Sequence, residues 1–175
     1  MSKSQNVHFK KYKLLLQEID QLSANLEDIH RKHMKCKNGC DSCCIDFSIF
    51  PIEFHYIQNN LKKENPTLKE ISKNDVCTFL NNHSCTIYQY RPIMCRTHGL
   101  PLIYANDNGE LELSACHLNF TEFNFEDFTM ENTLPQDKYN SKLFLLNKEF
   151  IAEFTDRKYG EMDLISLKEL ANSIK

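Results

Sequence analysis

The sequence predicts an α+β fold, mainly α, in which helices flank a cysteine-rich core that carries one or two short β-hairpins. Three observations support this prediction. Apolar residues recur with helical spacing near both ends of the 175-residue chain. All eight cysteines lie between Cys36 and Cys116, and two pairs of short strand-like segments lie in the same region. We expect a single domain over 1–175, with an N-terminal helix (1–35), a cysteine-cluster core (36–117) and a C-terminal helical segment (118–175).

The first predicted helix covers residues 9–35. Its apolar residues recur at alternating steps of four and three, which places them on one helical face: Leu15, Ile19, Leu22, Leu26 and Ile29. A second helix is predicted to begin near Pro51, because proline is favoured in the first turn of a helix. Asn65-Pro66-Thr67 is expected to end it, since the residue before a proline disfavours the helical conformation.

The central region favours hairpins. Two short strands are predicted at residues 76–80 and 85–88, on either side of a turn at 81–84. Cys77 lies on the first strand and Cys85 on the second. A short helix is expected over 91–96. A second hairpin is predicted from 100–104 and 110–114, because the intervening Asn106-Asp107-Asn108-Gly109 is a turn sequence.

Two helices are predicted after the last cysteine. Residues 136–154 carry Leu143, Leu146, Phe150 and Phe154 along one side. Residues 163–174 are predicted to form the last helix, with Asp163 as its N-cap, because a carboxylate accepts hydrogen bonds from the first free backbone N–H groups.

Composition excludes several classes of function. The net charge of −3 argues against non-specific attraction to nucleic acid or to anionic membrane. Only four glycines are present and none are clustered, which argues against a Rossmann or P-loop nucleotide site. No apolar run approaches the roughly twenty residues of a membrane span, and the first twenty residues do not resemble a secretory signal. We therefore expect a cytoplasmic protein, whose thiols stay reduced unless a metal binds them.

The cysteines are the strongest functional signal. Cys36-x3-Cys40-x2-Cys43 places three thiolates on a short loop, and thiolate sulfur suits zinc, copper(I) and iron–sulfur clusters. Neighbouring side chains of an extended segment point in opposite directions, so Cys43 and Cys44 are expected to serve different sites unless one of them is not a ligand. The eight cysteines could fill two four-cysteine sites. The loop spacing also occurs in radical S-adenosylmethionine enzymes, but Ser42 and the scarcity of glycine argue against that class.

The arrangement resembles the CxxCxxCC family, also called YkgJ-type cysteine-cluster proteins, which are described as zinc- or iron-chelating. The resemblance covers roughly residues 36–117 and rests on Cys77-Thr-Phe-Leu and Cys85-Thr-Ile-Tyr-x-x-Arg91-Pro92-x-x-Cys95-Arg96 together with the loop. It implies that all eight cysteine positions of the family are filled here. The implied metal ligands are Cys36, Cys40, Cys43, Cys44, Cys77, Cys85, Cys95 and Cys116.

Charged and aromatic residues near the cysteines have two interpretations each. Arg91 and Arg96 could neutralise thiolate charge and donate hydrogen bonds to sulfur, or could cap a turn and lie on the surface. We favour the role beside the metal for Arg91. His98 and His117 could each replace a thiolate as ligand, although the cysteines alone suffice.

Three functions remain open from the sequence. The favoured one is a protein with an iron–sulfur cluster of the 4Fe-4S type and a redox, sensing or iron-handling role. The second is a structural zinc module that mediates protein or nucleic-acid interaction, and the third is a small metalloenzyme. Metal ions are the expected partners. No membrane partner is expected, nucleic acid is disfavoured by charge, and no protein partner or catalytic residue can be named.

Overall fold

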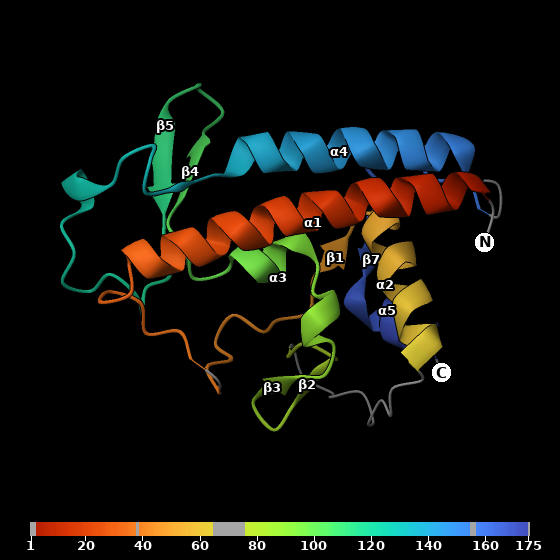
Figure 1. Ribbon diagram of the computed structural model, residues 1–175, viewed down its shortest axis with the longest axis horizontal. Coiled ribbons are helices and arrows are strands. Elements are labelled where there is room, and N and C mark those ends of the chain that lie inside the picture. The colour runs from red at the N-terminus through yellow and green to blue at the C-terminus, as the bar shows by residue number, and fades with distance from the viewer. Residues whose placement is uncertain (1–2, 38, 65–75, 155–156, 175) are drawn as a thin grey trace. The chain divides into compact units, whose positions relative to one another are not determined.

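Figure 1 shows the computed structural model of the chain, which describes residues 3–37, 39–64, 76–154 and 157–174. Helices dominate, with bounds α1 Lys3–Ile29, α2 Pro51–Glu64, α3 Ile93–Thr97, α4 Gln136–Glu153 and α5 Leu167–Asn172. The strands are short: β1 Ser48–Ile49, β2 Leu80–Asn81, β3 Ser84–Cys85, β4 Leu102–Ala105, β5 Leu111–Ser114, β6 Leu134–Pro135 and β7 Ile165–Ser166. Two 3₁₀ turns cover Tyr88–Tyr90 and Phe125–Asp127. The predicted α+β class with a mainly α composition is confirmed.

The first four predicted helices are present. α1 ends at Ile29, six residues before its predicted end, and α2 begins at Pro51 as proline placement predicted. The side-chain oxygen of fully buried Asn147 accepts a hydrogen bond from the Ile52 N–H at 3.2 Å, which satisfies one of the free donors at the start of α2. The predicted end of this helix at Asn65-Pro66-Thr67 lies outside the described residues.

The predicted start of the last helix is wrong. α5 begins at Leu167, and its N-cap is Ser166, whose hydroxyl accepts the Glu169 N–H at 3.0 Å. Asp163 instead accepts the Gly160 N–H at 2.8 Å and so closes a turn ahead of the helix. Ile165 and Ser166 form β7, which pairs antiparallel with β1. Pairing with a strand more than a hundred residues earlier therefore replaced the predicted first helical turn.

Both predicted hairpins are present, in altered form. β2 and β3 pair Leu80 with Cys85 and Asn81 with Ser84, so the first hairpin has a two-residue turn at Asn82 and His83. Cys77 precedes β2 and is not part of the arm where it was predicted. The second hairpin, β4–β5, overlaps its predicted strands, with β4 extending one residue further to Ala105. β6 adds a parallel strand to β4 that the sequence did not predict.

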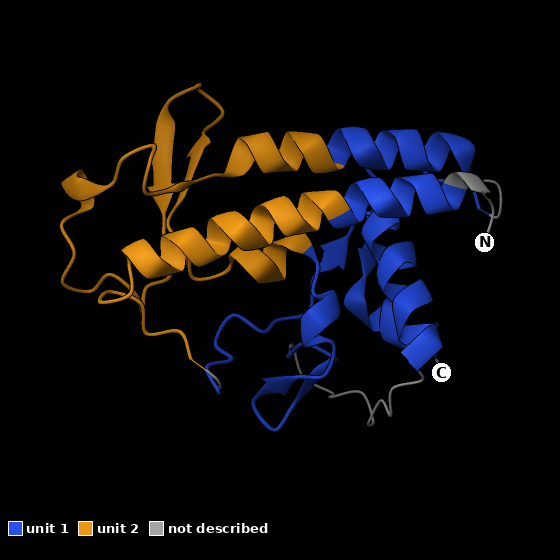
Figure 2. Cartoon of the chain, viewed as in Figure 1, with its two compact units in different colours: residues 1–13, 38–92, 144–175 blue, residues 14–37, 93–143 orange. Residues whose placement is uncertain are grey.

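The chain divides into two compact units, each built from separated segments (Figure 2). Unit 1 comprises residues 1–13, 38–92 and 144–175, and unit 2 comprises 14–37 and 93–143. The unit boundaries fall inside α1 and inside α4. Among the described residues, no helix has both the length and the apolar character needed to cross a bilayer.

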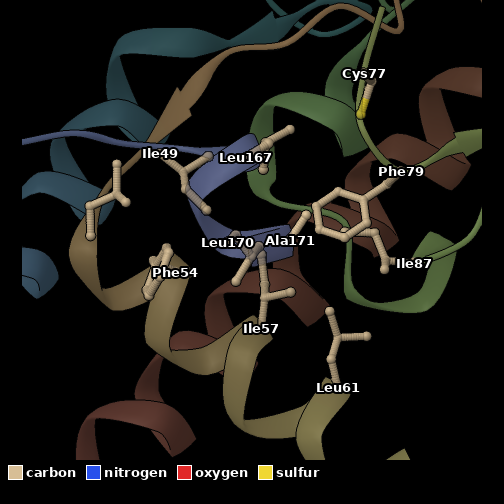
Figure 3. Packing of buried hydrophobic residues seen from close by; sticks show 11 residues of the cluster. Ile49, Phe54, Ile57, Leu61, Cys77, Phe79, Ile87, Leu167, Leu170 and Ala171 are labelled. Atoms are coloured by element: carbon tan, nitrogen blue, oxygen red, sulfur yellow. The ribbon is translucent and has the colours of Figure 1, made fainter. Parts of the chain in front are cut away.

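Unit 1 contains a buried apolar cluster built from α2, α5 and the segments around the first hairpin (Figure 3). Its members include Phe54, Ile57 and Leu61 of α2 and Leu170 of α5, all at most 5 % exposed. Elsewhere in this unit, Tyr12 of α1 donates a hydrogen bond to buried Glu53 at 2.9 Å. The cluster matters for function because cysteines lie at its margin.

Unit 2 is held together by contacts between distant segments. The carboxylate of Glu18 accepts hydrogen bonds from Lys142 at 2.7 Å and from Tyr139 at 3.2 Å. The His30 ring is buried among phenylalanines of the 120–128 segment, and its Nε2 lies 2.6 Å from the Asn132 carbonyl oxygen. These contacts attach the region after the last cysteine to α1.

Candidate metal centre

The eight cysteines are distributed over both units, and all are free thiols. Unit 1 contains Cys40, Cys43, Cys44, Cys77 and Cys85, and unit 2 contains Cys36, Cys95 and Cys116. The two sets are described separately below.

Three cysteines of unit 1, the core-edge cysteines Cys44, Cys77 and Cys85, are brought together by backbone pairing. An isolated antiparallel bridge joins Ile45 to Val76, and the Cys77 N–H donates to the Cys44 carbonyl oxygen at 3.0 Å. The Cys77 carbonyl accepts the Leu80 N–H at 2.9 Å, and Leu80 is paired with Cys85 across the hairpin. Residues 33 and 41 positions apart thus converge through two short pairings.

The core-edge cysteines lie against the buried apolar cluster. Cys77 is a member of that cluster with 9 % of its surface exposed, and Figure 3 shows its sulfur at the margin of the labelled side chains. Cys44 and Cys85 are half-buried and pack against the same cluster. Thiols at this margin have apolar contacts on one side, which makes their charged form costly in the absence of a cation.

Electrostatics at Cys44 show that the thiols are close enough to influence one another. Burial, followed by the negative charges of Cys43, Cys77 and Cys85, raises the pKa of Cys44 to about 12. Burial also raises the pKa of Cys77 and of Cys85. A bound cation would offset both the cost of burying a thiolate and the repulsion between neighbouring thiolates, because it supplies opposite charge.

The loop that carries Cys40 and Cys43 is tied to the tip of the first hairpin. His83 Nδ1 lies 2.9 Å from an Asp41 carboxylate oxygen, and the Cys44 N–H donates to the Asp41 carbonyl at 2.8 Å. Asn82 and His83 both have left-handed φ angles, 48° and 60°, as a type I′ hairpin turn requires. The sequence analysis did not predict this connection.

The cysteines of unit 2 are linked by Asn119, a residue that sequence reasoning missed. The Asn119 amide nitrogen donates to Cys36 Sγ at 3.3 Å and to the Gly99 carbonyl at 2.8 Å, and its amide oxygen accepts the Lys35 N–H at 2.7 Å. Its backbone N–H donates to the Cys116 carbonyl at 2.9 Å. No motif identifies such an asparagine, since its side-chain partners lie 20 to 84 residues away.

Gly99 lets the Cys36 sulfur approach closely. Its φ of +92° is in the region that favours glycine, and a Cβ there would lie 2.7 Å from Cys36 Sγ. Gly99 follows α3, which contains Cys95, so this approach brings the Cys36 loop against the segment that follows Cys95.

The charged residues predicted beside the metal have defined contacts. The Arg91 guanidinium carbon lies 3.7 Å from the centre of the Tyr88 ring, and its positive charge opposes the rise in the pKa of Cys85 that burial causes. Arg96 donates from Nη1 to both carboxylate oxygens of Asp20 at 2.7 Å, with its own side chain 8 % exposed. His98 and His117 are exposed.

The donor set fits a thiophilic metal. Thiolate sulfur is a preferred ligand for both zinc and iron–sulfur clusters, and at least three thiols of unit 1 come within electrostatic range of Cys44. Within 3–37, 39–64, 76–154 and 157–174, no three cysteine, histidine or carboxylate side chains already converge closely enough to hold one ion. Binding would therefore require the side chains to draw together, as is common where metal binding is coupled to folding.

Comparison with known families agrees with this chemistry. Residues 35–117 match the family model CxxCxxCC, whose description is "Putative zinc- or iron-chelating domain". The cysteine-rich segment is thus similar to a CxxCxxCC domain. The match includes all eight cysteines of the chain and both arginines discussed above, and it ends two residues before Asn119. It indicates metal binding. No curated protein and no solved structure matches the chain.

Proposed function

We propose that this protein holds an iron–sulfur cluster of the 4Fe-4S type through its cysteine thiolates and has a redox, sensing or iron-handling role. The observation that carries the proposal is the grouping of Cys43, Cys44, Cys77 and Cys85, whose negative charges together with burial raise the pKa of Cys44. Four thiolates are the usual ligand set of such a cluster. Cys43 lies in a turn closed by the bond from the Cys44 N–H to the Asp41 carbonyl, so the extended segment that was expected to separate Cys43 from Cys44 is not present. When bound, the cluster would supply one-electron chemistry at the margin of the apolar core.

The surroundings of the core-edge cysteines support a cluster in two ways. The apolar side chains packed against Cys77 limit solvent access, and solvent access is one of the factors that set the reduction potential of a cluster. Arg91 contributes positive charge near Cys85, where it would offset thiolate charge. Both features belong to this chain's own residues and act whichever metal is bound.

A zinc module is the second candidate. It is favoured by the position of Cys77 inside the apolar cluster, because structural zinc sites contribute directly to folding and their ligands are commonly anchored in the core. In this case the metal would stabilise the region around the first hairpin and would leave the protein without redox activity.

Metal and acid-labile sulfide analysis of anaerobically purified protein, with a visible absorption spectrum, separates these candidates. Brown protein with iron and sulfide is the expected result. Stoichiometric zinc without sulfide would replace the cluster with the zinc module, and protein that takes up neither metal would overturn both. Cys77→Ser should lower the metal content, whereas the control Thr78→Ser alters the adjacent residue and keeps every thiol, so it should retain the metal.

A further inference from the structure

We infer that Asn119 is a positioning residue for a second thiol site in unit 2, where it holds the Cys36 sulfur in place as a metal ligand and joins it to the segments of Cys95 and Cys116. The inference rests on the proposed metal binding and does not depend on whether the metal is iron or zinc. It adds a residue that lies beyond the family match.

The orientation of the Asn119 amide is fixed by its partners. The Lys35 backbone N–H can only donate, so the amide oxygen must face it, at 2.7 Å. The Gly99 carbonyl can only accept, so the amide nitrogen must face it, at 2.8 Å. These two bonds leave the second N–H of the amide directed to Cys36 Sγ at 3.3 Å.

Burial explains why this arrangement is specific. Asn119 is 3 % exposed, and a buried amide is costly unless its polar atoms are paired. Four side-chain hydrogen bonds satisfy it here: the amide oxygen accepts from the Lys35 N–H and, at 3.8 Å, from the Cys36 thiol, and the amide nitrogen donates to the Gly99 carbonyl and to Cys36 Sγ. The amide thus holds the Cys36 sulfur in one position through both its nitrogen and its oxygen.

The same asparagine connects the three cysteine segments of unit 2. Its backbone N–H bonds to the Cys116 carbonyl at 2.9 Å, and its side chain reaches Gly99, which follows the helix of Cys95. The next residue, Phe120, donates its N–H to the His33 carbonyl at 2.9 Å and so fixes this turn against the segment before Cys36. Loss of the side chain would remove the hydrogen bonds to Lys35, Cys36 and Gly99, while the two backbone bonds would remain.

Asn119→Asp is the sharpest test, because the change is isosteric. The carboxylate keeps an acceptor for the Lys35 N–H, removes both donors and places a negative charge beside Cys36 Sγ. Asn124→Asp is the matched control: it makes the same charge change five residues away in unit 2, where the exposed Asn124 side chain only accepts a hydrogen bond from the Glu126 N–H.

The probe is Co²⁺ added to the metal-free, reduced chain, with the sulfur-to-cobalt charge-transfer absorption as the readout. Asn119→Asp should weaken Co²⁺ affinity by about 10–100-fold, the usual cost of removing a partner of a metal ligand, and should lower the charge-transfer intensity at saturation. Asn124→Asp should bind as the unmodified chain does. In a Cys36→Ser background, Asn119→Asp should cause no further loss, because its effect passes through that sulfur.

Three results would overturn the inference. Equal affinity for Asn119→Asp and Asn124→Asp would show that the amide does not act on a ligand, and additive losses in the Cys36→Ser background would show that it acts elsewhere. Absence of Co²⁺ binding by the unmodified chain would overturn this inference alone, because the proposed cluster is decided separately by the iron and sulfide analysis. If circular dichroism shows that Asn119→Asp does not fold, Asn119→Ser, which adds no charge and cannot span both partners, takes its place with the same expected loss.

Discussion

Cys44 illustrates how one thiol responds to burial and to its neighbours at the same time. Its pKa rises from 9.0 to about 12, first because of burial and then because of the thiols at Cys43, Cys77 and Cys85. Without metal, its neutral form is therefore favoured in the folded chain. If these neighbours bind one metal together with Cys44, as we propose, attraction to the shared cation would replace this repulsion.

This shift predicts how the stability of the metal-free chain depends on pH. A group whose pKa is raised by folding holds its proton more tightly in the folded state, so its contribution to stability is fully present below pH 9 and is lost as pH rises towards 12. The free energy of unfolding should thus decrease over this window. Urea unfolding of the chelator-treated, reduced chain at several pH values should show a steeper decrease for the unmodified chain than for Cys44→Ser, and equal slopes would contradict the assignment.

The candidate ligands could be named from the sequence, because cysteine identity and spacing carry the chemistry directly. Their grouping could not, since Cys44 meets Cys77 through a bridge between Ile45 and Val76 that no local pattern encodes. Asn119 could not be identified from the sequence for a related reason. Asparagine is common in turns, and only the fold places this one against Cys36.

At the scale of elements, local signals located most helices and tertiary pairing corrected their ends. Apolar residues at helical spacing predicted α1 and α4, and the position of Pro51 predicted the start of α2. The last helix was misplaced because Asp163 and Ser166 are both acceptable N-caps, and the pairing of β7 with β1 decided between them. β6 was missed because its parallel partner β4 lies thirty-two residues earlier along the chain.

The N-cap assignment predicts the effect of a single substitution. Ser166→Ala removes the acceptor for the Glu169 N–H and should reduce the free energy of unfolding by about 1 kcal/mol. Ser141→Ala is the control, because Ser141 lies on the exposed surface inside α4 and not at its N-terminus. Chemical denaturation followed by circular dichroism measures both changes. A loss no larger for Ser166→Ala than for Ser141→Ala would reject the cap.

At the scale of the whole molecule, we propose that the two units unfold as one domain. Neither unit is a continuous stretch of chain, and the unit boundaries divide α1 and α4 in their interiors. A helix cannot melt in one half without removing hydrogen bonds that support the other half. Cooperative loss of both units is therefore expected.

Hydrogen exchange with peptide resolution tests this proposal. Backbone amides of α2 in unit 1 and of β4–β5 in unit 2 should lose protection at the same denaturant concentration. Two separate midpoints would instead establish two domains. The metal-free and metal-loaded forms should be compared, because a metal held by only one unit would stabilise that unit selectively if the two were independent.

The pairing of α1 with α4 can form only late in translation, because α4 follows every cysteine along the chain. The hydrogen bond between His8 and Glu153 spans 145 residues, and the ion pair between Lys11 and Glu149 spans 138. Every cysteine leaves the ribosome before α4 does, and the stretch from Cys116 to Glu153 takes about two to seven seconds at about 5–20 residues per second. The nascent thiols are thus accessible for several seconds before α1 has its partner. A metal ion bound in this interval would act on a chain whose α1–α4 pairing has not yet formed.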